Sequence, residues 1–315
     1  MPWVVWFLFP VYSLSLMLVE ASGEGVPYAF RRFVGEASRL LAEFEGLVGM
    51  PVLPIIMSPY RFIDRGVVDA VYSAVRGLGF RDLAVVLNSV GGDVDEAYLL
   101  ARYLQGVVGG RLVIYVLRLA KSAASLVALS GDELVMTPIA ELGPVDPVIY
   151  YARARRFVPI QSIIESFNKV LETLRGGGLP DRVISELLDR LPIVEIGDYA
   201  RALEHNIDLL VRVLTARMFR GDVDRAREVA KRLTGFKQHS AAVTVNDLVE
   251  MGVRVRVVGG REEEVLWRLY ELFVVDVVGT EELLPPDVGQ EVNVRLGRGV
   301  LIARVPIPKE TEESG

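Results

Sequence analysis

The sequence predicts an α/β protein in which a mostly parallel sheet is covered by helices on both faces. Between residues 50 and 136, short runs of Val, Ile and Leu alternate with segments of helical periodicity. Strands this uniformly apolar are typical of parallel sheets, because such strands are buried on both faces. No GxGxxG opens a predicted helix and no GxxxxGK[ST] occurs, which excludes dinucleotide and P-loop sites.

The order of elements follows from the same patterns. In the first half, strands are predicted at 51–57, 83–87, 112–117 and 132–136, with helices at 64–78, 93–105 and 122–129. The second half is mainly helical, with helices predicted at 161–174, from 180 onward, and at 199–219, 223–233, 244–251 and 261–274. After Pro285 and Pro286, alternating residues turn at Gly297-Arg298-Gly299 and predict a β-hairpin, followed by a polar tail.

The composition of the 315 residues is that of a globular protein with a large core, since 51% are apolar and 24% are charged. A net charge of −6 provides no basic field for a nucleic-acid backbone, so no nucleic-acid partner is expected. The chain has no Cys and only two His, which excludes disulfides, thiolate catalysis and a multi-histidine metal centre. No metal or other cofactor is therefore predicted.

The N-terminal residues 2–19 carry no charge and reach the lower limit of length for a membrane-spanning helix. The first basic residues, Arg31 and Arg32, follow this stretch, and the positive-inside rule then places the body of the protein in the cytoplasm. The sequence thus predicts a transmembrane anchor over 1–22 in a single-pass membrane protein. A cleaved signal peptide and a buried helix of the folded domain are the alternatives.

The next segment, 28–48, has apolar residues at helical spacing along one continuous face. It predicts an amphipathic juxtamembrane helix over 23–49. This helix either lies on the bilayer, mediates oligomerisation, or simply packs on the domain.

A glycine turn follows the predicted strand at 83–87 and precedes a helix. It reads Asn88-Ser89-Val90-Gly91-Gly92. Adjacent glycines allow positive φ, so their N–H groups can point into a cavity and hold an oxyanion at a helix N-terminus. A plain tight turn explains the same residues.

Ser122 stands at a second strand-to-helix turn and is followed by small residues. A serine there has its hydroxyl near the positive end of the helix, and the N–H of Ala123 is free to act as a further oxyanion donor. Ser122 is therefore a candidate nucleophile, and an ordinary N-cap serine is the alternative.

A serine nucleophile needs a base. His205 falls within a predicted long helix and is interpreted as structural, whereas His239 falls in a loop from which it can be aimed at a site. Asp146 lies in the Leu-Gly-Pro-Val-Asp-Pro turn, which fixes it between two prolines. A surface histidine and a turn aspartate are the alternatives.

Together these segments resemble a known family. The glycine turn, the segment AKSAASLVALSGDE, the turn LGPVDP and a late histidine before a Thr-Val run occur in that order. This order is similar to the serine dehydrogenase proteinase family, membrane-anchored relatives of the Clp protease and of signal peptide peptidase A. The resemblance extends from the N-terminal anchor to about Val257. It implies the Clp protease/crotonase fold, a polypeptide substrate and a homo-oligomer.

The resemblance also implies an activity and its residues. It implies a serine endopeptidase acting through an acyl-enzyme. It assigns a catalytic triad formed by Ser122, Asp146 and His239. It also assigns an oxyanion hole formed by Gly91, Gly92 and Ala123.

The sequence departs from the family pattern at Val90, where Pro is usual, and at Ala123 and Ala124, where Gly is usual. These changes keep open a catalytically inactive scaffold at the membrane. A Ser–Lys peptidase with Lys169 as base is a further alternative, although a solvated lysine is the simpler interpretation. Crotonase-type acyl-CoA chemistry would use the same glycines without a serine nucleophile.

Four segments result from these predictions. They are the anchor (1–22), the juxtamembrane helix (23–49), the Clp protease-like domain (50–260) and a C-terminal helix with hairpin and tail (261–315).

Overall fold

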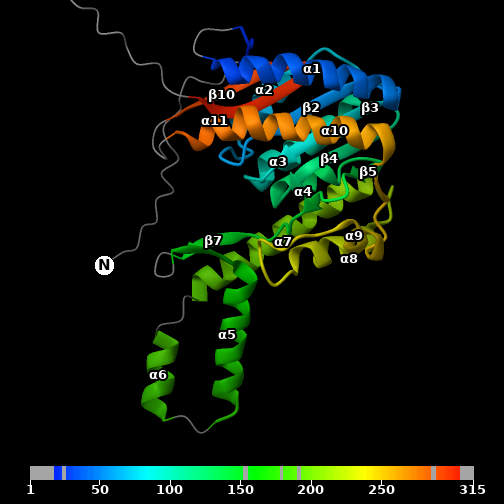
Figure 1. Cartoon of the computed structure of the whole chain (residues 1–315). Coiled ribbons are helices and arrows are strands. Elements are labelled where there is room, and N and C mark those ends of the chain that lie inside the picture. Colours follow the sequence, from blue (N-terminus) through cyan, green and yellow to red (C-terminus); the bar gives the residue numbers. More distant parts are fainter. Residues whose placement is uncertain are drawn as a thin grey trace, which may run out of the picture.

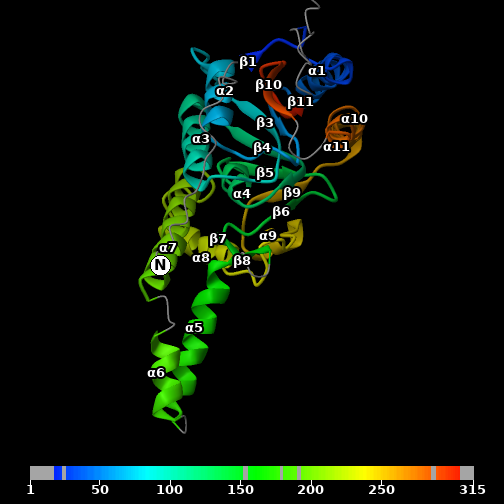
Figure 2. The same cartoon turned by 90° about the vertical axis from the view of Figure 1, so that its left-hand side faces the viewer.

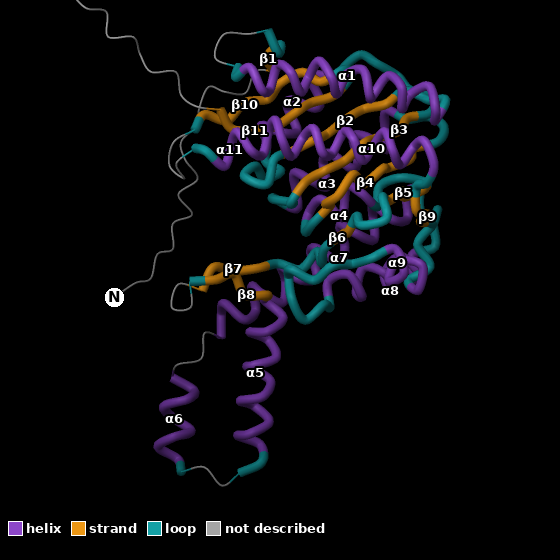
Figure 3. Tube along the Cα trace, in the orientation of Figure 1, coloured by secondary structure: helices purple, strands orange, loops and turns teal. Residues whose placement is uncertain are grey.

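A computed structural model of the chain describes residues 18–22, 26–151, 155–177, 180–189, 193–284 and 289–305. Within these ranges the main sheet has nine strands in the order β1-β10-β11-β2-β3-β4-β5-β9, with β6 paired to β4. Only the β10–β11 hairpin is antiparallel, and every other neighbouring pair is parallel. Figure 1 views this sheet through one of the layers of helices that cover it, and Figure 3 separates helices, strands and loops by colour.

Between residues 50 and 136, the elements occur in the predicted order and have bounds close to the predicted ones. The strands of the main sheet are β1 (Leu18–Val19), β2 (Val52–Met57), β3 (Leu83–Ser89), β4 (Leu112–Ala120), β5 (Glu133–Met136), β6 (Glu141–Leu142), β9 (Val255–Val257), β10 (Gln290–Leu296) and β11 (Gly299–Val305). A separate hairpin pairs β7 (Val148–Tyr151) with β8 (Arg156–Pro159). The helices are α1 (Tyr28–Val48), α2 (Arg65–Val75), α3 (Val94–Val107), α4 (Ala123–Ala128), α5 (Ile160–Arg175), α6 (Asp181–Asp189), α7 (Ile193–Ala216), α8 (Val223–Thr234), α9 (Val245–Glu250), α10 (Gly260–Phe273), the π-helix η1 (Val274–Val278) and α11 (Gly279–Glu282).

Alternation along the strands divides the core into two layers, one on each face of the sheet. In β2, Leu53 and Ile55 pack into the cluster formed with α2, α3, α4 and α7. Their neighbours Val52 and Ile56 pack on the opposite face with α1 and α10. Figure 2 shows the two helical layers on either side of the sheet. A parallel sheet covered in this way explains why its strands read as unbroken apolar runs.

The amphipathic segment predicted as a juxtamembrane helix is α1, and it packs on the sheet beside α10. Phe30, Phe33 and Phe44 on its apolar face are fully buried. The ring of Phe33 makes an edge contact with Phe273 of α10, at a centroid distance of 6.0 Å. The sheet and α10 therefore cover the apolar face of α1, in agreement with the alternative that this helix packs on the domain.

The predicted membrane anchor requires a correction. Residues 1–17 lie outside the described residues, but Leu18 and Val19 form β1, which pairs in parallel with Asn293 and Val294 of β10. Along the described part of the chain, no helix is both long enough and apolar enough to cross a membrane. The prediction of a single-pass membrane protein is overturned by this finding, because the apolar end of the predicted span is an edge strand of the sheet.

The C-terminal hairpin extends the main sheet. Ile302 of β11 lies opposite Met57 of β2, in a parallel pairing that joins the hairpin to the first strand of the predicted α/β region. The predicted boundaries at 22, 49 and 260 stay predictions. In contrast to the hairpin, α5 and α6 project away from the sheet as a two-helix arm (Figures 1 and 2).

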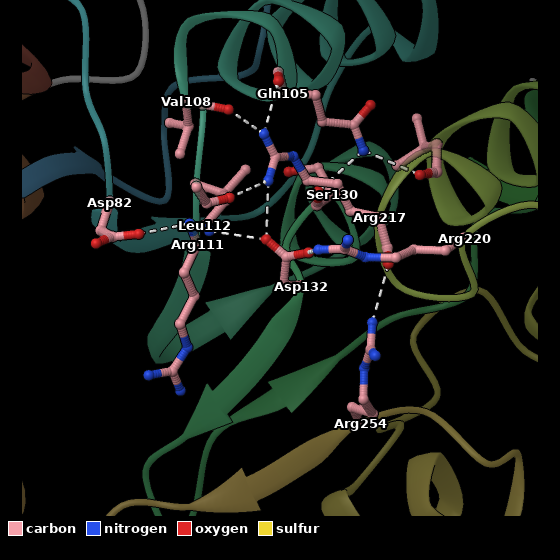
Figure 4. A network of polar contacts seen from close by, with 12 residues as sticks. Asp82, Gln105, Val108, Arg111, Leu112, Ser130, Asp132, Arg217, Arg220 and Arg254 are labelled. Carbon is pink, nitrogen blue, oxygen red and sulfur yellow. Dashed lines mark hydrogen bonds and ion pairs between the residues drawn. The ribbon is translucent and has the colours of Figure 1, made fainter.

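A polar network fixes the C-terminal end of α7 to the ends of the strands where β4 and β5 begin (Figure 4). The guanidinium of Arg217 donates to the Gly110 carbonyl and to Asp132, both at 2.8 Å, and to the carbonyls of Gln105 and Val108. Asp132 in turn accepts from the backbone N–H of Leu112 at 2.9 Å. This network lies at the end of β4 opposite to Ser122, so it holds α7 in place without contributing to the candidate site.

Candidate active site

Ser122 lies in a sharp turn between β4 and α4, and its backbone has φ 51° and ψ −127°. A residue with a side chain rarely adopts this positive φ, and such strained strand–turn–helix serines present their hydroxyl at the edge of a sheet. Ser122 is half-buried, and its hydroxyl makes no capping hydrogen bond to α4. Ser122 therefore does not act as a side-chain N-cap of α4, which was the alternative interpretation.

Small residues allow the chain to close tightly around this turn. A Cβ on Gly91 would lie 2.8 Å from Ser122 Cβ and 2.5 Å from the Lys121 carbonyl oxygen. A Cβ on Gly143 would lie 3.0 Å from the Ser122 nitrogen. The buried Ser125 hydroxyl lies 2.6 Å from the Ala120 carbonyl oxygen and accepts the Gly143 N–H at 3.0 Å. The turns that carry Gly91, Ser122 and Gly143 are thus in direct contact.

The glycine turn next to Ser122 leaves one N–H of its own without a partner. The Gly91 N–H donates to the Ser89 hydroxyl at 3.1 Å, and the Gly91 carbonyl accepts from Ile63 at 2.8 Å. A Cβ on Gly92 would lie 2.3 Å from backbone atoms of Ile63. Among the described residues, nothing accepts a hydrogen bond from the N–H of Gly92 or of Ala123. These two groups are the ones available to an oxyanion.

The Asp146 carboxylate and the His239 imidazole lie together, as the predicted triad requires. His239 Nδ1 and Asp146 Oδ1 are 2.8 Å apart, and the side chains are 30% and 1% exposed, respectively. An Nδ1–H donated to the carboxylate leaves Nε2 free to accept a proton. No described group is hydrogen-bonded to the second, buried oxygen of Asp146.

Two contacts hold this pair in place. The loop after His239 is joined to β6 because Leu142 and Val243 exchange both of their backbone hydrogen bonds, each at 3.0 Å. On the other side, the buried Asn206 amide of α7 donates to the Val145 carbonyl at 2.9 Å, one residue before Asp146.

The structure does not join every predicted site residue. No hydrogen bond between the Ser122 hydroxyl and His239 is found in the described part of the chain. In enzymes without substrate this contact is often long and tightens only in the complex, so its absence does not exclude His239 as base.

The alternative base Lys169 lies on the projecting helix α5. Its side chain is 79% exposed and pairs with Glu172 at 3.2 Å. A lysine acts as a base when burial removes water from its ammonium, and this exposure provides no such burial. His205, interpreted as structural, has Nε2 2.8 Å from Asp95 Oδ1 at the start of α3.

Two residues beside the site have contacts that the sequence did not predict. Asn88, buried at the end of β3, donates to the Met57 carbonyl and accepts from the Leu119 N–H, which ties three strands together behind the glycine turn. Lys121 contacts the loop that carries His239. Within the described ranges, no group of three or more His, Asp or Glu side chains is arranged to hold a metal ion.

Two uncharacterized proteins of Methanocaldococcus jannaschii are similar in sequence. MJ1495 is 29% identical over 196 residues, which cover 62% of this chain and 52% of that protein. MJ0137 is 28% identical over 248 residues, 78% of this chain and 76% of that protein. This chain thus spans about half the length of the first of these relatives.

Among the solved structures that match part of this chain are two of the 1510-N membrane-bound stomatin-specific protease. One is a mutant in complex with a substrate peptide, with a TM-score of 0.41 and 15% identity over 68% of this chain and 76% of that one. The other mutant has a TM-score of 0.41 and 14% identity, and the match covers 68% of this chain and 81% of that one.

A protein-family model also matches the chain. It spans residues 42–290, which include the glycine turn, the Ser122 turn, Asp146 and His239. Because this match covers most of the sequence, the chain belongs to the ClpP-like SDH-type serine proteinase family.

Proposed function

We propose that this protein is a serine endopeptidase that cleaves peptide bonds through an acyl-enzyme on Ser122. One observation carries the proposal. A strained serine and two unpaired N–H groups lie at one edge of the sheet, while a histidine is already hydrogen-bonded to a buried aspartate. Membership of a serine proteinase family supports the same chemistry.

In the proposed reaction, the Ser122 oxygen attacks the peptide carbonyl carbon and its proton passes to His239 Nε2. The carbonyl oxygen becomes an oxyanion held by the N–H groups of Gly92 and Ala123. Each such donor is typically worth about 3 kcal/mol in the transition state. The intermediate collapses when the leaving amine takes the proton from His239, and water then hydrolyses the Ser122 ester by the reverse sequence.

Asp146 has a separate role in this scheme. Its buried carboxylate fixes the tautomer of His239 and stabilises the imidazolium that forms during proton transfer. Gly91 contributes through its missing side chain, because its own N–H is bonded to Ser89 and a Cβ there would strike Ser122.

The base in the proposal is His239 and not Lys169, since the latter is exposed on the arm. A polypeptide substrate and a homo-oligomer stay predictions.

Labelling with a fluorophosphonate probe tests the proposal directly. We expect one adduct per chain, placed on Ser122 by peptide mass spectrometry, because only an activated serine reacts readily with this electrophile. The Ser122→Ala variant should lose the adduct, and His239→Ala should slow labelling by about 10³-fold or more. His205→Ala, which removes the other histidine, is the matched control and should label at the wild-type rate.

Other outcomes favour specific alternatives. Labelling that survives His239→Ala but disappears in Lys169→Met would replace the histidine by the lysine as base. If the protein unfolds cooperatively, and is therefore folded, but forms no adduct, the result would favour the catalytically inactive scaffold. The departures from the family pattern at Val90, Ala123 and Ala124 are the sequence features that support this alternative.

A further inference from the structure

Lys121, the residue immediately before Ser122, is a charged group whose contacts reach the other side of the site. Its side chain is only 17% exposed, although lysine ammonium groups are usually kept in water. The ammonium donates to the Ala241 carbonyl at 2.8 Å and lies 3.4 Å from the carbonyl oxygens of Ser240 and Leu142.

These carbonyls belong to the two segments that carry the rest of the triad. Ser240 and Ala241 directly follow His239, and Leu142 precedes Asp146 by four residues. The ammonium of Lys121 therefore bridges the histidine loop and the aspartate turn. The backbone of Lys121 is bonded directly to that of the nucleophile Ser122. The Lys121 N–H also donates to the Ser89 carbonyl at 3.0 Å, which fixes the same residue to the glycine turn.

The charge of Lys121 is balanced nearby. Its ammonium lies 3.4 Å from Glu141, which is also 3.6 Å from Arg118. No hydrogen bond from this ammonium to the Ser122 hydroxyl is present in the described ranges, and adjacent side chains diverge in a turn of this kind. The contacts therefore suit an element that holds the loop, and not a base for Ser122.

We propose that Lys121 is a positioning residue that sets the distance between His239 and Ser122 by binding the carbonyls of the histidine loop. The proposal rests on the function proposed above. Its physical basis is that an ammonium bound to several carbonyls in a partly buried place replaces hydrogen bonds that the loop cannot make itself. A displacement of about 1 Å at such a distance typically costs about 100-fold in rate.

The first test is the fluorophosphonate labelling rate of Lys121→Met, which keeps the length and apolar stem of the side chain. We expect the rate to fall by roughly 10- to 100-fold. The midpoint of thermal unfolding should change little, because water can reach the carbonyls of the exposed Ser240 and the half-buried Ala241, and Leu142 still accepts from the Val243 N–H. Lys121→Arg should recover part of the loss, since a guanidinium can donate to the same carbonyls. Lys237→Met is the matched control, because it removes an exposed lysine from the same loop two residues before His239.

A double-mutant cycle separates positioning from a general structural effect. If Lys121 acts through His239, then Lys121→Met should cause no further loss of rate in the His239→Ala background. A loss of equal size in both backgrounds would overturn the proposal, and so would a wild-type rate in Lys121→Met. Faster labelling of His239→Ala than of Lys121→Met would overturn it in favour of Lys121 as the base.

An independent measurement needs no activity. The Nδ1–H proton shared by His239 and Asp146 should give a downfield proton NMR signal, and the chain has only two histidines, so His239→Ala assigns it. We expect this signal to weaken or disappear in Lys121→Met and to persist in Lys237→Met. An unchanged signal in Lys121→Met would overturn the proposal, whether or not the wild-type protein labels. A wild-type protein that does not label would contradict only the peptidase function.

Discussion

At the scale of single residues, the backbone of Ser122 is the clearest sign of function. Its φ of 51° and ψ of −127° are suited to glycine and cost other residues about 1–3 kcal/mol. We therefore expect Ser122→Gly to be more stable than Ser122→Ala, by roughly 1 kcal/mol in the free energy of unfolding. Urea denaturation of the two variants, both of which lack the nucleophile, measures this difference.

The neighbouring helix supplies the control for this comparison. Ser125 lies inside α4, where glycine is less favourable than alanine by about 0.5–1 kcal/mol. The order of stability should therefore reverse at this position, with Ser125→Ala above Ser125→Gly. If alanine is the more stable replacement at position 122 as well, the strain assigned to Ser122 is absent.

The residues that sequence reasoning identified have a strong local context. Gly91 and Ser122 each stand where an apolar strand gives way to a helix, and this pattern can be read over a few positions. The contact between Lys121 and the histidine loop could not be predicted, because its partner Ala241 is 120 residues away. The fit of His239 to Asp146, separated by 93 residues, could be expected only from the family resemblance.

At the scale of elements, the hydrogen bonds of Arg217 hold the end of α7 against the sheet. The side chain is 11% exposed and its donors are distributed over backbone carbonyls and Asp132. Arg217→Met would remove four hydrogen bonds to these partly buried acceptors, and we expect the free energy of unfolding to fall by about 3 kcal/mol. Chemical denaturation followed by circular dichroism measures the loss.

Arg220 provides the matched comparison, because it pairs with the same carboxylate at the same 2.8 Å but is 70% exposed. An exposed ion pair contributes little, so Arg220→Met should lower stability by less than about 1 kcal/mol. Equal losses in the two variants would show that the charge on Asp132, and not the partly buried carbonyls, dominates the network.

The elements that periodicity predicts are those with many residues. The helices and strands between residues 50 and 136, and α8 to α10, have bounds close to the predicted ones. The strands β6 to β8 have two to four residues each, too few for an alternating pattern to stand out. The position of β11 beside β2 could not be predicted, because two strands so far apart in the sequence share no local pattern that indicates their pairing. The apolar end of the predicted anchor illustrates the same limit, since Leu18 and Val19 are used by a strand.

At the scale of the whole molecule, two carboxylates shape the dependence of stability on pH in opposite directions. Burial alone would raise the pKa of Asp132, but hydrogen bonds from Leu112, Arg220 and Arg217 outweigh it and lower this pKa below 3.8. The stability contributed by Asp132 is therefore present above pH 3.8 and lost as the pH falls through its folded-state pKa. Glu281 acts at the other end of the pH range.

Burial raises the pKa of Glu281 from 4.5 to about 7, against hydrogen bonds from the Arg304 N–H and from Ser58 and the charges of Arg304 and Arg61. Because the folded protein binds this proton more tightly than the unfolded chain, the contribution of Glu281 is fully present below pH 4.5. It is lost as the pH rises through about 7.

The Glu281→Gln variant should separate this contribution from the rest of the molecule. Gln keeps an acceptor for the Arg304 N–H but cannot ionise, so it removes the cost of burying a carboxylate charge. Between pH 4.5 and pH 8, we expect the wild-type free energy of unfolding to fall by about 3 kcal/mol more than that of Glu281→Gln. Urea denaturation at several pH values, which adds no salt, measures the two slopes. Glu282→Gln is the control, because it neutralises the adjacent exposed carboxylate and should leave the wild-type slope unchanged. Parallel profiles for wild type and Glu281→Gln would mean that Glu281 is already ionised in the folded protein, with Arg61 and Arg304 stabilising its charge.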